Sequence, residues 1–160
     1  KSERKTAKLF AAGAECAATL TAGENNGMIA AARDYALNFG IAFQIIDDIL
    51  NFTEKDNKTG KPAGNDLKNG IITAPVIFAI EDETINGKSE LKTLLNTKFK
   101  NESEFDKALK LVTSSKGIEK SFQLAENYTQ KAIDCLSGFN DSKYKQALIE
   151  LVMYSMERKS

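Results

Sequence analysis

The sequence predicts an all-α fold of six or seven helices in one domain, residues 1–160. Apolar residues recur at three- and four-residue spacing along most of the chain, which is the periodicity of an amphipathic helix. Short breaks rich in glycine and asparagine separate these stretches. No stretch alternates apolar and polar residues as a half-buried strand would. Helices alone therefore account for the pattern.

Each expected helix rests on a local signal. Residues 2–21 repeat alanine, the best helix former, at helical spacing. Residues 28–51 are strongly apolar and contain no proline, which predicts a long central helix. Pro75 falls in the first turn of the following helix, where its missing N–H costs little. The expected helices span residues 2–21, 28–51, 71–83, 89–95, 103–114, 118–136 and 142–157, the last with Ser142 as its N-cap.

Residues 51–70 predict a long polar loop with little secondary structure of its own. This stretch holds three glycines and a proline among lysine, asparagine and aspartate residues. A loop of that length in a compact domain usually has a function.

The composition excludes several kinds of site. The 160 residues include no histidine, so no imidazole can act as a base, an acid or a metal ligand. Cys16 and Cys135 lie far apart and outside any CxxC motif, which excludes a zinc site and indicates a reducing compartment. The 22 basic and 22 acidic side chains give a net charge of zero, which argues against nucleic acid as the main partner.

The chain carries no pattern of membrane insertion or export. Its longest nearly apolar stretch, residues 71–80, is far shorter than the about 20 residues that cross a bilayer. The first residues, KSERKT, lack the basic-then-apolar pattern of a signal peptide. Because residue 1 is not methionine, we expect the chain to be part of a longer one.

Polar side chains interrupt the helix expected over residues 28–51. Gln44, Asp47, Asp48 and Asn51 lie three and four residues apart, so they form a polar stripe along that helix. Adjacent carboxylates repel each other and need a cation, and without histidine or cysteine ligands Mg²⁺ fits best. Because substrate phosphates usually complete the coordination of Mg²⁺, the stripe indicates a phosphorylated substrate. The alternative is that Asp47 and Asp48 begin the solvated end of the helix.

Two other segments have residues suited to binding phosphate. The loop over residues 60–70 combines glycines with Lys61 and Lys68, and it lacks the GxxxxGK[ST] pattern of a P-loop. Lys5 and Thr6, near the start of the first helix, form a second candidate pair. Many ordinary surface loops have the same composition as residues 60–70, and for Lys5 an exposed helix end is the commoner explanation.

Three short motifs in order resemble one known family. They are KTA at residues 5–7, FQIIDDILN at residues 43–51, and GK at residues 60–61 followed by Asp66 and by TAP at residues 73–75. Together they resemble the C-terminal half of the trans-isoprenyl diphosphate synthases, most nearly the long-chain, solanesyl-type polyprenyl diphosphate synthases. The resemblance continues through the last helices and covers essentially the whole chain.

The resemblance implies an all-helical prenyltransferase in which Mg²⁺ bridges aspartates to an allylic diphosphate. Once the diphosphate leaves, the double bond of isopentenyl diphosphate attacks the allylic cation and a proton is lost. Asp47 and Asp48 match the first two acids of the family's second aspartate-rich motif, so the resemblance makes them metal ligands. Asp66 matches a loop acid that supports the metal and lysine network.

The resemblance also assigns the groups around the diphosphate. Lys5 and Lys61 match lysines that grip the allylic diphosphate. Thr6 and Gln44 match neighbours that line the same site, and Phe43 and Gln44 are expected to face the carbocation.

The chain departs from the family pattern in three respects. Asn51 stands where the family usually has a third aspartate, and its neutral amide offers an oxygen but no charge. Ile71 stands where many relatives have lysine. The family also needs a first DDxxD motif, and none occurs in this sequence. We therefore expect the chain to hold at most half of a catalytic site and to be inactive alone.

Two other functions remain open from the sequence. One is a non-catalytic partner subunit that keeps the family's fold, which the change at Asn51 favours. The other is an unrelated helical interaction domain. By resemblance the protein is expected to form a homodimer, or a heteromer with a catalytic subunit. The cytosol and the plastid stroma are both compatible with its composition.

Overall fold

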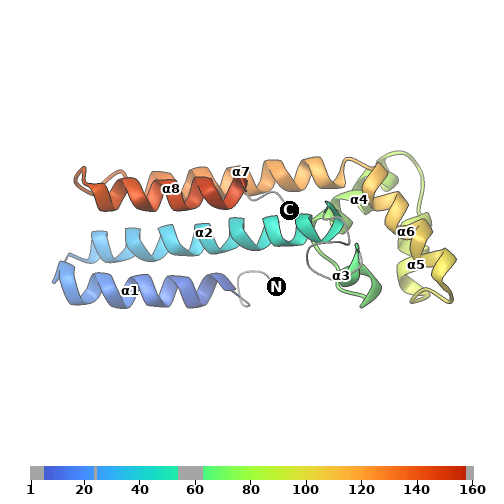
Figure 1. The fold of residues 1–160 in the computed structure, drawn as a ribbon, viewed down its shortest axis with the longest axis horizontal. Helices are drawn as coiled ribbons and strands as arrows, with labels where there is room; N and C mark the ends of the chain where they lie inside the picture. Colours follow the sequence, from blue (N-terminus) through green and yellow to red (C-terminus); the bar gives the residue numbers. More distant parts are fainter. Residues whose placement is uncertain (1–5, 24, 54–62, 158–160) are drawn as a thin grey trace. The chain divides into compact units, whose positions relative to one another are not determined.

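The computed structural model describes residues 6–23, 25–53 and 63–157. Those residues contain eight helices and no strand (Figure 1), which confirms the all-α class. None of these helices is long and apolar enough to cross a membrane. The helices are α1 (Lys8–Ala22), α2 (Asn26–Thr53), α3 (Asn65–Lys68), α4 (Ala74–Ile85), α5 (Glu90–Asn96), α6 (Glu102–Ser114), α7 (Gly117–Cys135) and α8 (Lys143–Glu157).

The prediction of a loop without secondary structure over residues 51–70 was wrong at both of its ends. At one end α2 continues to Thr53, and at the other Asn65–Lys68 form α3. Gly64 precedes α3 with a φ of 73°, a left-handed conformation that glycine adopts without strain. A Cβ at Gly64 would also lie 2.8 Å from Leu109 Cδ1. A helix of four residues is too short for apolar periodicity to reveal it.

Side chains mark where several helices begin. Pro75 lies in the first turn of α4, as the sequence predicts. The Ser142 hydroxyl accepts a hydrogen bond from the Lys145 amide at 3.1 Å, which confirms Ser142 as the N-cap of α8. Asn101 caps α6 in the same way, accepting from the Glu104 amide at 2.9 Å.

The described chain divides into two compact units, and α2 and α7 contribute to both. The first unit contains α1, α2 as far as Ile46, α7 from Leu124 onward, and α8. Its helices run alongside one another, with α1 antiparallel to α2 and α7 antiparallel to α8 (Figure 1). Their shared core consists of Tyr35, Ala36, Ala132, Leu136 and Val152.

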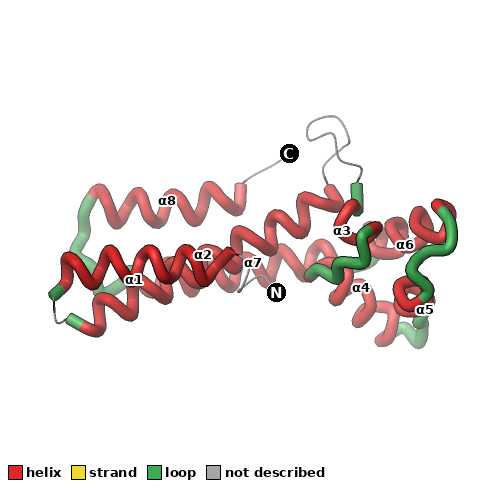
Figure 2. Tube along the Cα trace, turned by 90° about the horizontal axis from the view of Figure 1, so that it is seen from below, coloured by secondary structure: helices red, strands yellow, loops and turns green. Residues whose placement is uncertain are grey.

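The second unit contains the end of α2 from Asp47, α3 to α6, and the start of α7 (Figure 2). Its core draws one or more residues from each of α2 to α6. Glu83 of α4 is buried there, and its carboxylate accepts a hydrogen bond from the Leu91 amide in the first turn of α5 at 2.9 Å. The core residues are Phe52, Leu67, Val76, Ala79, Leu91, Phe105, Ala108 and Val112.

Tyr35 makes the first unit less stable at alkaline pH. Its buried hydroxyl donates to the Leu148 carbonyl of α8 at 2.8 Å, and burial raises the pKa of Tyr35 to about 12 from 10.0. The folded phenol therefore stays neutral where the unfolded one ionises. Its stabilisation is complete below pH 10 and declines as the pH rises toward 12.

We expect Tyr35→Phe to lower the free energy of unfolding by about 1 kcal/mol at pH 7. The difference between the natural chain and this variant should shrink above pH 10, because only the natural chain loses the phenol's contribution. Urea unfolding followed by circular dichroism between pH 7 and 11.5 measures both effects. Tyr144→Phe is the control, since Tyr144 is exposed on α8. A difference that stays constant to pH 11.5 would contradict this account.

Candidate functional site

The second half of α2 carries the polar stripe that the sequence predicts. Gln44 and Asp48 lie one turn apart and are buried, with 6% and 9% of their surface exposed. Asp47 and Asn51 lie one turn apart and are half-buried. Since Asp48 is buried and α2 continues to Thr53, these acids do not begin a solvated helix end. A carboxylate is much less common at a buried position than the isoleucines beside it, which makes this stripe the candidate site.

Thr6 and Gln44 meet although 38 positions separate them. The Thr6 hydroxyl donates to the Gln44 side-chain oxygen at 3.1 Å within the first unit. The structure thus brings together two of the residues that the resemblance assigns to one site. Lys5 and Lys61, the predicted diphosphate-binding lysines, lie outside the described residues.

Gly40 allows α1 to approach α2 closely beside this hydrogen bond. A Cβ at Gly40 would lie 2.6 Å from Ala7 Cα and 2.9 Å from Ala7 Cβ. Such distances are too short for any side chain, so only glycine fits here. The sequence analysis assigned Gly40 no role, although a glycine inside a long helix is a recognised signal of close packing.

Phe43 belongs to an aromatic cluster in the first unit. Its ring packs edge-on against Phe10 and Phe39, with centroids 6.4 and 6.2 Å apart. Phe10 of α1 in turn stacks on Phe39 at 5.6 Å. The sequence analysis singled out Phe43 alone. The four-residue spacing of Tyr35, Phe39 and Phe43 along α2 was a signal that could have revealed Phe39, but it does not point to Phe10 of α1.

Asn51 fixes the segment that contains Asp66 to the end of α2. Its side-chain oxygen accepts from the Asp66 amide at 3.1 Å, and its carbonyl accepts from the Gly64 amide at 2.7 Å. The Asp66 amide lies in the first turn of α3, where backbone donors have no partner within the helix. Leu67, next in the chain, is fully buried in the core of the second unit. Asp66 is therefore fixed on both sides, although its carboxylate is half-buried.

The donor set of α2 suits a hard divalent cation. Asp47 and Asp48 offer carboxylate oxygens from adjacent positions of one helix, and such oxygens are the ligands that Mg²⁺ prefers. Within the described residues no three acidic or cysteine side chains gather closely enough to hold a metal ion by themselves. This arrangement fits Mg²⁺, which is commonly held by one or two carboxylates while substrate phosphates supply the rest.

Comparison with known proteins decides the family. The family model for polyprenyl synthetase matches residues 1–112. The chain belongs to the polyprenyl synthetase family. It is 39% identical to a probable mitochondrial hexaprenyl pyrophosphate synthase of Neurospora crassa over 99% of this chain and 34% of that protein. It is 40% identical to a prenyl transferase of Cyanophora paradoxa over 99% of this chain and 47% of that protein.

Solved structures of the family agree with this assignment. Heptaprenyl diphosphate synthase from Staphylococcus aureus matches with a TM-score of 0.88 at 28% identity, over 99% of this chain and 48% of that one. A polyprenyl synthase from Caulobacter crescentus, solved in complex with calcium and isoprenyl diphosphate, matches with a TM-score of 0.85 at 32% identity, over 99% and 48%. The chain thus spans about half or less of the length of these members of the polyprenyl synthetase family.

We expect Asn51→Ala to loosen α3, because the Asp66 amide loses its hydrogen-bond acceptor. The free energy of unfolding should fall by about 1–2 kcal/mol, and hydrogen exchange at the Asp66 amide should become faster. Asn51→Asp keeps an acceptor oxygen and should preserve that protection. Asn86→Ala, at an exposed asparagine that bonds only within its own segment, is the control. Unchanged exchange at Asp66 in Asn51→Ala would show that the bond does not hold α3.

Proposed function

We propose that this chain is the C-terminal part of a polyprenyl diphosphate synthase that condenses isopentenyl diphosphate with an allylic diphosphate. The observation that carries the proposal is the buried polar stripe of α2, where Gln44 and Asp48 interrupt a run of buried apolar residues. Ile45 and Ile46 lie between them and Ile49 follows them, all three buried, so folding alone would favour apolar residues at these positions. Membership of the polyprenyl synthetase family supplies the chemistry that such a stripe would serve.

In this proposal Asp47 and Asp48 hold Mg²⁺ through their carboxylate oxygens. The bound ion would neutralise the negative charge that develops on the departing diphosphate. Asn51 adds a neutral oxygen at the next turn of the helix, and its existing bond to the Asp66 amide keeps Asp66 in position. The polyprenyl synthase from Caulobacter crescentus was solved in complex with calcium and isoprenyl diphosphate. This complex supports the proposal that the present chain also binds a divalent cation and a diphosphate.

The remaining assigned residues act on the substrates. Lys5 and Lys61 would pair with the oxygens of the allylic diphosphate, and ammonium groups suit that role as point charges. The Thr6–Gln44 bond orients the Gln44 amide, so that its dipole is fixed before substrate binds. Phe43 would present an aromatic ring, whose electron-rich face stabilises a nearby cation.

We also propose that the chain acts only together with further helices. It spans 34% and 47% of two curated relatives, and no DDxxD motif occurs in its sequence. The outer face of α1 supports the same view, because Leu9 and Leu20 are 76% and 87% exposed. These two leucines lie eleven positions apart, about three helical turns, so they share one face. A solvent-exposed apolar face of this kind marks an interaction surface.

A second candidate function is a non-catalytic subunit of a heteromeric synthase. Asn51 favours it, since the amide removes one negative charge from the stripe and its oxygen already accepts the Asp66 amide. A relative in Schizosaccharomyces pombe, 37% identical over 99% of this chain and 40% of that protein, is named decaprenyl-diphosphate synthase subunit 1. Under this alternative the protein would raise the activity of a partner without needing its own acids.

The deciding experiment is a prenyl transfer assay on the complete gene product with Mg²⁺, isopentenyl diphosphate and an allylic diphosphate. We expect Asp47→Asn and Asp48→Asn each to lower kcat by about 100-fold or more, because a lost metal ligand weakens charge stabilisation at the leaving group. Asp106→Asn, at an exposed acid of α6, is the matched control and should keep full activity. Full activity in both active-site variants would refute the catalytic proposal.

The same assay separates the second candidate. The subunit function would be identified if the complete product does not lengthen a prenyl chain on its own but stimulates a catalytic partner. That stimulation should be as strong in the Asp47 and Asp48 variants as in the natural protein.

The exposed face of α1 predicts how the isolated 160-residue chain behaves in solution. We expect the isolated chain to self-associate as its concentration rises. The double variant Leu9→Lys with Leu20→Lys should stay monomeric, because lysine removes the apolar contact at both positions. Sedimentation velocity measures the effect. Thr19→Lys adds charge to an exposed position of α1 without removing a leucine and serves as the control. A natural chain that remains monomeric at high concentration would contradict the assignment of this face.

A further inference from the structure

The second unit contains a cavity that the proposed function does not use. Its volume is about 460 Å³, and the end of α3, the segment before α4 and the turn between α5 and α6 line it. Sites for small molecules typically have volumes of about 300–1,000 Å³. Lys68, which the sequence offered as a phosphate-binding candidate, lines this cavity, but the proposed function gives it no role, and none of the residues to which it does assign metal or diphosphate binding lies there.

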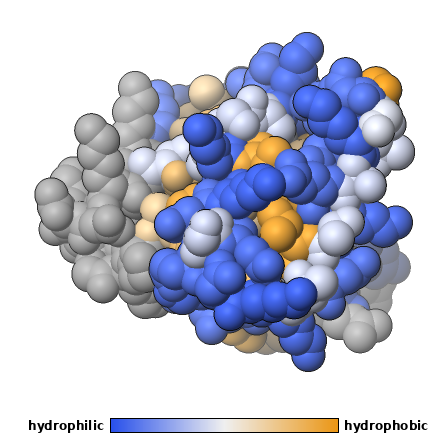
Figure 3. Space-filling view, turned by 90° about the vertical axis from the view of Figure 1, so that its right-hand side faces the viewer, coloured by the Kyte–Doolittle hydropathy of each residue, from blue (hydrophilic) through white to orange (hydrophobic). Residues whose placement is uncertain are grey.

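One part of the cavity wall is apolar and rests on the core of the second unit, while Lys68, Asn69, Gly70 and Lys98 form the rest. Ile72 is 43% exposed, while Leu95 and Phe99 are partly buried and pack against the core. Phe99 also meets Phe105 edge-on, with ring centroids 5.8 Å apart. Figure 3, which views the molecule from the right-hand side of Figure 1, shows small groups of hydrophobic residues among hydrophilic ones on that face. Water in such a cavity contacts hydrocarbon, so an apolar group would displace it favourably.

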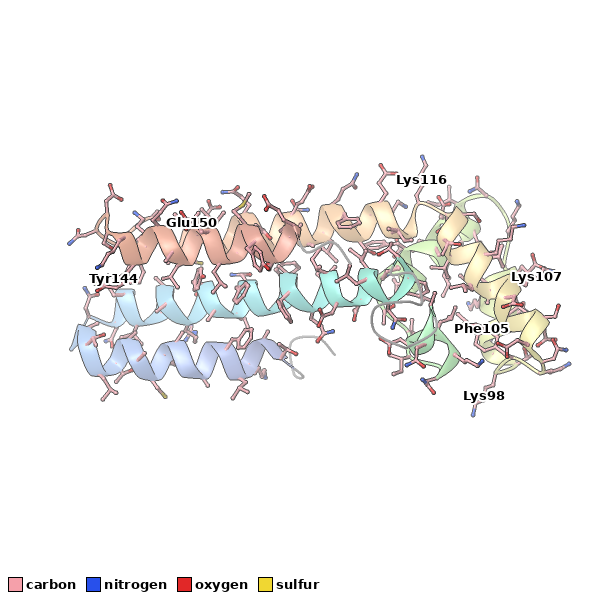
Figure 4. All side chains as sticks on the ribbon, in the orientation of Figure 1. Lys98, Phe105, Lys107, Lys116, Tyr144 and Glu150 are labelled. Carbon is pink, nitrogen blue, oxygen red and sulfur yellow. The ribbon has the colours of Figure 1, made fainter. Side chains whose placement is uncertain are left out.

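The cavity carries two lysines in different electrostatic states. Lys68 is neutralised by Glu102, whose carboxylate oxygens lie 2.9 and 3.1 Å from its ammonium nitrogen. Lys98 makes no ion pair with any described residue, and its side chain extends outward from the turn between α5 and α6 (Figure 4). Residues 88–116 contain seven lysines and four acidic residues. Lys98 therefore brings to the cavity a positive charge that no described residue neutralises, within a positively charged segment.

The backbone at the cavity is held in an uncommon conformation. Lys98 and Phe99 have φ angles of 54° and 49°, the left-handed region that residues other than glycine rarely enter. Two such residues in succession turn the chain so that Phe99 reaches the core while Lys98 lines the cavity. Strained backbone of this kind is concentrated at ligand-binding sites, where the surrounding structure maintains it.

We propose that this cavity binds an amphipathic anion, a single hydrocarbon chain that ends in a phosphate or carboxylate group. The chain would lie against Ile72, Leu95 and Phe99, and the anionic group would pair with the Lys98 ammonium. The combination of an apolar wall with one uncompensated cation selects such a molecule over a neutral lipid and over a free anion. The site takes no part in the proposed prenyl transfer, so its test and the test of the proposed function can succeed or fail separately.

Nuclear magnetic resonance on the ¹⁵N-labelled 160-residue chain tests the proposal, with dodecyl phosphate kept below its micelle-forming concentration as the probe. We expect shifts of the Gly70, Ile72 and Leu95 amides that saturate with the probe. Lys98→Gln should weaken binding about threefold or more by removing the ion pair, and Ile72→Ser should weaken it about fivefold by removing apolar contact. Lys92→Gln changes an exposed lysine of α5 outside the cavity and should leave binding unchanged.

Any of four results would overturn the inference. The first is that dodecyl maltoside, which has the same hydrocarbon chain without a charge, binds as tightly as dodecyl phosphate. The second is that inorganic phosphate alone produces the same shifts. The third is that the shifts occur on the exposed apolar residues of α1 and α8 and do not change in Lys98→Gln. The fourth is that phosphatidylglycerol vesicles bind the chain while monomeric dodecyl phosphate does not, which would indicate binding to a membrane surface instead of a ligand in the cavity.

Discussion

Burying polar side chains on an otherwise apolar helix is the constraint on which this structure depends. Gln44 and Asp48 are almost fully enclosed, and an enclosed polar group is costly unless it finds a partner. The Gln44 side-chain oxygen accepts a hydrogen bond from the Thr6 hydroxyl, which requires the start of α1 to lie against α2. That approach is possible because Gly40 has no side chain where Ala7 passes. The small side chain of Ala7, directly before α1, and the glycine at position 40 are thus explained by the need to satisfy the Gln44 amide.

The second unit meets the same constraint through the backbone. Asn51 ties the last turns of α2 to the segment before and within α3, accepting one amide through its side chain and another through its carbonyl. The burial of Leu67 then anchors α3 to the core from the other side. Because Asp66 lies between these two attachments, a short helix of weak intrinsic stability becomes a fixed support for an acid.

The sequence predicts those features of the structure that depend on local spacing. The long helix α2, its polar stripe, Pro75 in the first turn of α4 and the N-cap Ser142 all follow from residues within one or two turns of each other. The bond between Thr6 and Gln44 spans 38 positions, and only the resemblance to a known family paired them. Periodicity also cannot tell which apolar faces meet, so the division into two cores was not foreseen. The four residues of α3 fall below the length at which a helical pattern is detectable.

Asn51 shows how one position serves both folding and chemistry. A carboxylate there would also accept the Asp66 amide, so the fold alone does not explain the amide. The difference is charge, since a third acid one turn from Asp47 would increase the repulsion among carboxylates whenever no cation is bound. An amide relieves that repulsion and retains an oxygen, but it contributes less to holding a divalent ion. Under the proposed function Asn51 would therefore lower the affinity for the cation and raise the stability of the fold when no cation is bound. The size of that effect would distinguish a synthase with weaker metal binding from a subunit that does not bind metal.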